Sequence, residues 1–347
     1  MRGKGINYDT GFSPGGESSR PEFDPEIVRR EMQVIASELG CTAVRITGGD
    51  PERLTIAAER AATAGLEIWF SPFPCELPTG QLAPLLADCG DRAEHLRRSG
   101  ARVVLVTGAE LTLFASGFLP GADFFDRIRR LQSPGQEHYA AFAALPGKLN
   151  GVLAESVAAV RERFGGPVTY ASGPWEHVDW QPFDIVATDA YRDATNTEGF
   201  REELRKHLGH GKPLAVTEFG CCCYAGAGDR GGMGWAIIDE SADPARLDGD
   251  YTRDEAEQVG YLADLHAIFD AEGVDLAFWF TFAGYNLPHR SEPRQDLDMI
   301  SYGVVTMLEA GPPAGYQGLG WTPRLAFGAL ASQLSRPDHA MPVSRRL

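Results

Sequence analysis

The chain has 347 residues, and its 48 acidic residues outnumber its 32 Lys and Arg, which gives a formal net charge of −16. This excess of negative charge repels nucleic-acid phosphates, so we exclude nucleic-acid binding. No apolar run approaches the roughly 18 residues that cross a membrane, and the N-terminus has no signal-peptide pattern. We therefore expect a cytoplasmic, globular protein with no membrane partner.

Short runs of apolar and β-branched residues alternate with helical patterns along the whole chain. Eight runs predict strands at residues 5–8, 42–46, 66–71, 103–107, 168–171, 185–188, 214–217 and 276–282. The runs begin about 39 residues apart on average, which is the length of one strand and one helix with modest loops. Eight such units in succession predict an α/β fold, the (β/α)8 TIM barrel.

The helices between these strands have their own start signals. Asp24 and Asp50 each precede a proline and then a run of apolar residues at helical spacing, which is typical of an N-cap with proline in the first turn. Further helices are expected at residues 81–99, 136–164, 198–208, 253–272 and 323–334.

We expect a single domain over residues 1–347, with two long loops. One follows the fourth strand at about residues 111–131, and the other follows the seventh strand at about residues 221–251. Both leave the carboxyl ends of strands, which is the face where barrel enzymes build their sites. The second loop is rich in glycine but lacks the Gly-Lys-Ser/Thr ending of a phosphate-binding loop, so it is expected to be a mobile lid.

The fourth and seventh strands each deliver a glutamate to this face, Glu110 and Glu218. Two carboxylates that face each other across a pocket are the minimal equipment for glycoside hydrolysis. One attacks the anomeric carbon, and the other delivers and removes protons. An arginine inside an apolar strand needs a buried partner, and Arg45 in the second strand is expected to find a carboxylate.

On these residues the chain resembles the clan of retaining (β/α)8 glycoside hydrolases, nearest to its cellulase and β-mannanase branch. In that clan the nucleophile ends strand seven inside a Thr-Glu-Phe-Gly sequence, which stands here at 217–220, and the acid/base ends strand four. The resemblance implies that Glu218 is the nucleophile and Glu110 the acid/base. The sequence around Glu110 is also similar to an uncharacterised bacterial group, some of whose members are labelled abortive-infection proteins.

Three further positions match the clan. The resemblance implies that Arg45 holds the nucleophile ionised, that Tyr191 orients it, and that Trp279 is the platform beneath the sugar. One position departs from the clan, because Ala109 stands where the clan has an asparagine that contacts the sugar 2-hydroxyl. Either another group replaces that amide, or the substrate is unusual.

Other polar and aromatic residues follow the predicted strands and are candidate substrate contacts. They are Tyr8, Asp9, Trp175, Glu176, His177, Asp189, Tyr285 and Asn286. Tyr8 and Asp9 are expected to face the pocket floor. None of the acidic and histidine residues has a metal-binding spacing, so we predict no metal site and no cofactor. The six cysteines, three of them adjacent at 221–223, are expected to be reduced.

The favoured function is a retaining glycoside hydrolase-like enzyme whose partner is a small-molecule substrate, a glycoside. One alternative keeps the pocket and both acids but performs a lyase, cyclisation or rearrangement step on a specialised metabolite. Another alternative is a binding or phage-defence protein on a barrel that no longer catalyses a reaction. The sequence does not decide the substrate or the oligomeric state.

Overall fold

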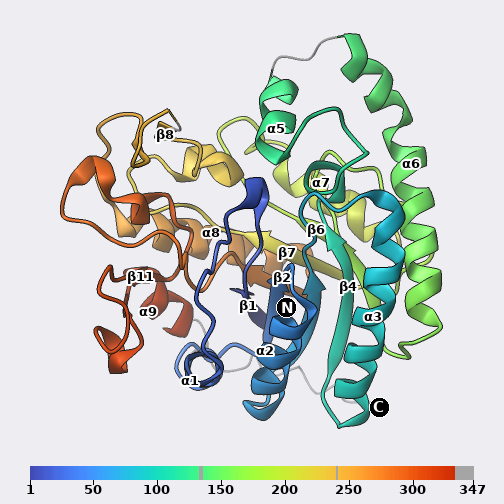
Figure 1. Ribbon diagram of the computed structural model, residues 1–347, viewed down its shortest axis with the longest axis horizontal. Helices are drawn as coiled ribbons and strands as arrows, with labels where there is room; N and C mark the ends of the chain where they lie inside the picture. The colour runs from blue at the N-terminus through green and yellow to red at the C-terminus, as the bar shows by residue number, and fades with distance from the viewer. Residues whose placement is uncertain (133–135, 240, 333–347) are drawn as a thin grey trace, which may run out of the picture.

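A computed structural model describes residues 1–132, 136–239 and 241–332. Its centre is a ring of eight parallel strands (Figure 1). These strands are β1 (Gly3–Asp9), β2 (Ala43–Gly48), β3 (Glu67–Pro72), β4 (Val103–Ala109), β5 (Val168–Ala171), β6 (Val186–Asp189), β7 (Leu214–Phe219) and β10 (Leu276–Trp279). Their order is β5-β4-β3-β2-β1-β10-β7-β6, and a parallel bridge between Ser172 and Thr188 joins the two edge strands. The predicted (β/α)8 barrel is confirmed.

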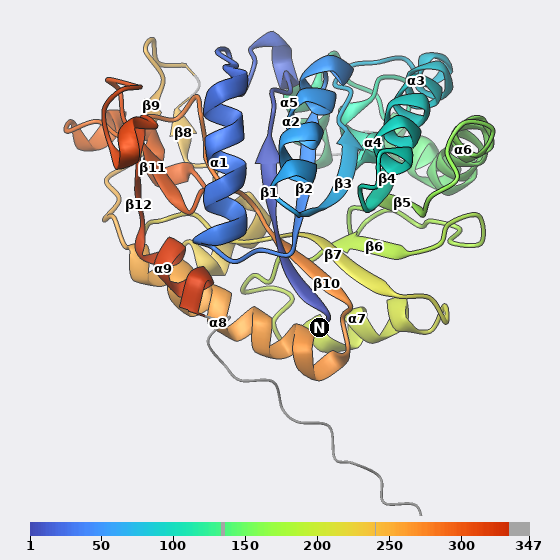
Figure 2. The same ribbon diagram turned by 90° about the horizontal axis from the view of Figure 1, so that it is seen from below.

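Helices form the outer layer. They are α1 (Pro25–Ser37), α2 (Pro51–Thr63), α3 (Thr79–Arg98), α6 (Gln136–Arg161), α7 (Phe200–Leu208), α8 (Glu255–Glu272) and α9 (Leu325–Ser332). Figure 2 shows α1, α2, α3 and α6 side by side along one side of the strands, with α7 and α8 along the other. The side chains of Asp24 and Asp50 cap α1 and α2, as predicted, by accepting hydrogen bonds from backbone N–H groups in the first turn. Residues 333–334 of the last expected helix lie outside the described residues.

Two details differ from the regular pattern. The segment 172–185, between β5 and β6, contains no helix. The expected long loop after β4 is partly helical, with α4 (Leu111–Phe114) and α5 (Phe124–Gln132). Arg127 of α5 is buried and donates a 2.7 Å hydrogen bond to Glu76, which ties this segment to the loop after β3.

The loops after β7 and β10 carry short antiparallel hairpins. β8 (Ile238–Asp239) pairs with β9 (Arg246–Leu247), and β11 (Val305–Met307) pairs with β12 (Trp321–Pro323). Every helix in the described ranges is too short or too polar to cross a membrane. All six cysteines are free thiols.

The interior of the barrel changes from apolar to polar along its axis. In the middle the rings of Trp69 and Phe278 meet edge to face, 4.9 Å apart. Nearer the carboxyl ends, Asn7 and Arg45 are fully buried and hydrogen-bonded to each other. A buried polar layer must be satisfied internally, and this one ends at Glu218, where the candidate site begins.

Candidate active site

Glu218 lies near the end of β7, where two side chains hold its carboxyl group. Arg45 Nη1 donates to Oε1 at 2.6 Å, and the Tyr191 hydroxyl donates to Oε2 at 3.0 Å. The Arg45 side chain is fully buried, and that of Glu218 is 13% exposed. A charge-assisted hydrogen bond in such a site stabilises the negative charge of the carboxylate. The remaining exposure leaves the group open to a ligand from the mouth.

The Arg45 guanidinium is itself fixed by three elements of the barrel. Nε donates to the Ser71 hydroxyl at 3.2 Å, and Nη1 donates to the Asn7 amide oxygen at 3.1 Å and to the Thr217 carbonyl at 3.3 Å. Because β1, β3 and β7 all contribute partners to this side chain of β2, the barrel itself sets the direction of the guanidinium. The contact to Glu218 is therefore preorganised.

Glu110 follows β4 and has the unusual left-handed backbone conformation, with φ 42° and ψ 41°. This conformation costs a non-glycine residue free energy and is found most often at functional sites. Burial raises the pKa of Glu110 well above its ordinary value, and the charges of Asp189 and Glu218 raise it further. A carboxyl that keeps its proton near neutral pH is suited to general-acid catalysis.

Asp189 ends β6 and stands beside Glu218 in the strand register. It is 2% exposed, and neither carboxyl oxygen has a hydrogen-bond partner among the described residues. Burial raises its pKa well above the ordinary value, as does the charge of Glu218, while the charge of Arg45 opposes the shift. Three acids thus share one buried arginine, so Asp189 is expected to remain protonated.

This protonation can be tested through stability. The raised pKa of Asp189 means that its stabilising contribution is complete below the ordinary Asp value of about 3.9 and is lost as pH rises toward the folded-state pKa. Asp189→Asn should therefore gain free energy of unfolding relative to wild type as the pH rises from 5 to 8, by about 1.4 kcal/mol for each pH unit that lies below the folded-state pKa. Urea unfolding at both pH values measures the difference. Asp250→Asn, at an exposed position, is the control. A loss of relative stability with rising pH would contradict a protonated Asp189.

Trp279, the expected sugar platform, differs in exposure from the next residue in the chain. Trp279 is fully buried, its indole N–H donates to the Tyr302 carbonyl, and its ring packs on Phe219. It therefore offers no face to a ligand, and the expectation for Trp279 is wrong. The next residue, Phe280, is partly exposed, and its ring lies 5.7 Å from that of Tyr302, which in turn lies 6.0 Å from Tyr191. Phe280 therefore has the exposed aromatic surface that Trp279 lacks, and Tyr302 connects it to Tyr191.

Tyr8 and Tyr285 are also placed apart from Glu218. Because Asn7 points into the barrel, the next side chain of β1 points outward, and the Tyr8 hydroxyl donates to Glu31 of α1 at 2.6 Å. Tyr285 donates to the same carboxylate, which also pairs with the buried Arg20. These residues stabilise the packing of α1, which corrects the expectation that Tyr8 lines the pocket floor.

The remaining candidates lie around the mouth. Asp9 accepts a hydrogen bond from the Gly11 N–H, so it shapes its own loop. The buried Glu176 accepts from the Thr112 N–H and hydroxyl and from the Tyr170 hydroxyl, so it supports the segment after Glu110. Trp175, His177 and Asn286 are exposed.

Comparisons with known proteins extend this picture. No protein-family model matches the sequence, and no curated protein matches it. A GH113 β-1,4-mannanase structure matches with a TM-score of 0.62 and 12% identity, covering 97% of this chain and all of that chain. The GH113 β-mannanase from Alicyclobacillus acidocaldarius, in complex with ManMIm, matches with a TM-score of 0.59 and 16% identity over 95% and 96%. A β-glucuronidase from Ruminococcus gnavus matches with a TM-score of 0.53 and 15% identity over 96% of this chain and 49% of that one. At these identities the likeness shows the fold, which is a glycoside hydrolase-like (β/α)8 barrel.

Sequence reasoning missed two polar residues of the site, Asn7 and Ser71, and for the sugar platform it chose Trp279 rather than its neighbour Phe280. Asn7 had a usable signal, because a polar side chain inside a short apolar strand implies a buried partner, as it does for Arg45. Ser71 had none, since small polar residues occur at many strand ends.

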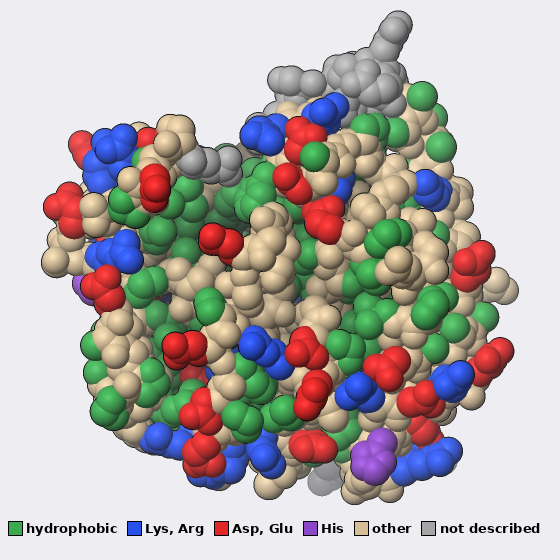
Figure 3. Space-filling model, viewed as in Figure 1, with side chains coloured by type: hydrophobic (Ala, Val, Ile, Leu, Met, Phe, Trp, Pro, Cys, Tyr) green, Lys and Arg blue, Asp and Glu red, His purple; other side chains and the backbone are tan. Residues whose placement is uncertain are grey.

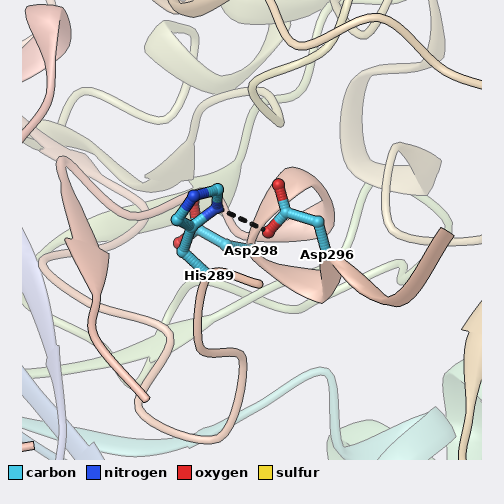
Figure 4. A group of neighbouring side chains, drawn as sticks. All are labelled: His289, Asp296 and Asp298. Carbon is cyan, nitrogen blue, oxygen red and sulfur yellow. Dashed lines mark ion pairs between the residues drawn. The ribbon is translucent and has the colours of Figure 1, made fainter. Parts of the chain in front are cut away.

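A further cluster lies after β10, where His289 points toward Asp296 with Asp298 alongside (Figure 4). The His289 Nδ1 lies 3.0 Å from Asp296. Both carboxylates already pair with guanidinium groups, since Arg253 bridges them at 2.8 Å and Arg324 binds Asp298. Their negative charge is balanced by arginine, so the cluster is explained as an ion-pair network that anchors this loop.

Proposed function

We propose that the protein is a retaining glycoside hydrolase that acts on a small glycoside, with Glu218 as nucleophile and Glu110 as acid/base. One observation carries the proposal, namely that the two acids at the carboxyl ends of β4 and β7 have contrasting environments. Glu218 is held by a buried guanidinium, whereas burial and neighbouring charges raise the pKa of Glu110. A carboxylate bound by a guanidinium, together with a second carboxyl group whose pKa is raised, is the arrangement that a nucleophile and an acid/base require.

The proposed reaction follows from the environments of these two acids. The Glu218 carboxylate attacks the anomeric carbon while Glu110 gives its proton to the leaving oxygen, so the bond to the leaving group breaks and a glycosyl ester forms. Glu110 then takes a proton from water, the oxygen of which attacks the same carbon and releases Glu218. The Tyr191 hydroxyl and Arg45 keep the carboxylate oxygens of Glu218 oriented throughout.

The proposal is tested by trapping the ester. A 2,4-dinitrophenyl 2-deoxy-2-fluoro-glycoside slows both steps, but its activated leaving group lets the first proceed, so the ester accumulates. Incubation with gluco, manno and galacto forms should add one fluoroglycosyl mass to the intact protein, and peptide mapping should place that mass on Glu218. Glu198→Gln, at an exposed position, should label like wild type. Absence of label with all three reagents, or label on another residue, would reject the proposed nucleophile.

Ala109 favours a second candidate, a lyase or rearrangement enzyme with the same acids. The methyl side chain of Ala109 is buried beside Glu110 and cannot hydrogen-bond a sugar 2-hydroxyl. Analysis of products in water enriched with oxygen-18 separates the two candidates. A hydrolase places the heavy oxygen on the anomeric carbon, whereas a lyase or rearrangement does not.

A further inference from the structure

The segment after β4 crosses the mouth of the barrel. We call residues 115–132 the crossing arm. Its Phe125 packs against Gly15 of the segment after β1, where an added β-carbon would lie 2.9 Å from the ring. Its Phe124 and Phe125 rings lie 6.4 and 6.3 Å from the ring of Trp235, in the segment after β7. Figure 1 shows α5 beside the tip of the segment after β1 and beside the segment that carries β8.

The crossing arm continues a row of aromatic rings. Phe12 and Phe73 lie 5.0 Å apart, Phe73 and Phe114 lie 4.6 Å apart, and Phe114 stacks on Phe124 at 4.2 Å. We call the row Phe12, Phe73, Phe114, Phe124, Phe125 and Trp235 the aromatic wall. Figure 3 shows hydrophobic side chains gathered where the segments of α5 and β8 meet. Because the segments after β1, β3, β4 and β7 all contribute, the wall spans the mouth.

Hydrogen bonds to one carboxylate hold the crossing arm in place. Glu76, in the loop after β3, accepts hydrogen bonds from the Phe124 backbone N–H at 2.8 Å and from the Arg127 guanidinium at 2.7 Å. The Arg127 side chain is fully buried. These charge-assisted bonds fix the position of the arm over the mouth.

The leaving-group side of the site is more open. Glu110 must lie beside the leaving oxygen, and Thr112, two residues further on, accepts a 3.0 Å hydrogen bond from the indole N–H of Trp175. Trp175 is 37% exposed. An exposed aromatic face next to the acid/base can take a bulky leaving group. With the leaving group on this side, we assign the sugar ring to the opposite side, toward the crossing arm.

We propose that the aromatic wall closes the sugar end of the site, so that the enzyme removes one terminal sugar and cannot cleave inside a chain. This inference rests on the proposed function. A cleft of about 700 Å³ lies between the segments after β1, β2 and β3, and Phe73 lines it, but neither catalytic acid does. The cleft and the acids thus have no lining residue in common. Under this proposal, a second sugar attached to the first would meet the wall.

The experiment compares two trapping reagents on the same protein. One is the activated 2-fluoro monosaccharide that labels best, and the other carries one more sugar on its non-reducing end. In each productive reaction the Glu218 carboxylate forms a bond to the anomeric carbon and dinitrophenolate leaves. We expect the monosaccharide reagent to label the wild-type protein at least tenfold faster than the disaccharide reagent does. In Trp235→Ala and in Trp235→Ala/Phe125→Ala, the ratio of the disaccharide labelling rate to the monosaccharide labelling rate should rise at least tenfold above that of wild type. Phe142→Ala, an exposed aromatic on α6, is the matched control.

The outcomes separate the inference from the function on which it rests. Equal labelling of wild type by both reagents would overturn the closed sugar end but leave the glycosidase intact. If labelling by the disaccharide reagent does not rise in the variants, then the aromatic wall is not what excludes the second sugar. Absence of label from every reagent would reject the proposed function, and the inference with it. The wild-type comparison needs no variant, so it remains decisive if a substituted protein fails to fold.

Discussion

Glu218→Gln is expected to lose activity on every substrate, by about 10⁴-fold or more, because the amide cannot form the glycosyl ester. The substitution keeps the shape of the side chain and removes only its charge. The two hydrogen bonds that Glu218 receives show why this charge matters, since Arg45 and Tyr191 both donate to it. Steady-state rates on an activated aryl glycoside measure the loss.

Glu110→Gln should behave differently, because this variant loses only proton transfer. With a poor leaving group we expect a loss of about 10²- to 10⁴-fold, the usual contribution of general acid–base catalysis. With an activated aryl group the first step should survive and the second should stall, which produces a burst of aryl release. Azide should then restore turnover, since this anion attacks without base assistance and yields the glycosyl azide. Azide rescue of Glu218→Gln with retained configuration would reverse the two roles.

Arg45→Lys is expected to lower kcat/KM by about 10²-fold, the scale of a misplaced catalytic group. A lysine keeps the charge but cannot bind Glu218, Asn7 and Ser71 at once, because it lacks the planar fork of the guanidinium. Arg45→Ala should also lower the free energy of unfolding by about 3–5 kcal/mol, since it leaves a buried carboxylate without its partner. Initial rates and urea unfolding measure the two effects.

Arg324→Lys provides the matched control. Arg324 is also fully buried and paired to a carboxylate, that of Asp298, but it lies outside the site. We expect this variant to be destabilised while kcat/KM stays within about threefold of wild type. If Arg45→Lys loses stability and keeps its rate in the same way, then Arg45 supports the fold and not the nucleophile.

The sequence by itself determined the architecture and the strand ends on which the acids stand. Periodic apolar runs about 39 residues apart predict a barrel whatever the loops contain, because each run must be buried against its neighbours. The same patterns placed Glu110 and Glu218 at the carboxyl ends of β4 and β7. The partner of Arg45 was also foreseeable, since a guanidinium inside an apolar strand requires a buried acceptor.

Only the tertiary structure decided which of two adjacent side chains enters the site. Asn7 points inward and Tyr8 outward, and Phe280 rather than Trp279 is partly exposed. Successive strand residues face opposite sides, so an error of one position at a strand end reverses the assignment. Composition cannot correct that error, because the aromatic residues suit either side.

The path of the crossing arm and the raised pKa of Asp189 were also beyond the sequence. The crossing arm contacts Gly15 and Trp235, which are separated from it by about a hundred residues in each direction. Such contacts depend on the conformations of loops, and loops have no periodic sequence pattern from which those conformations could be predicted. Asp189 follows a strand like many other acids. Its pKa is raised because the barrel buries it beside Glu218, and burial of that kind is a property of the assembled ring and not of any local segment.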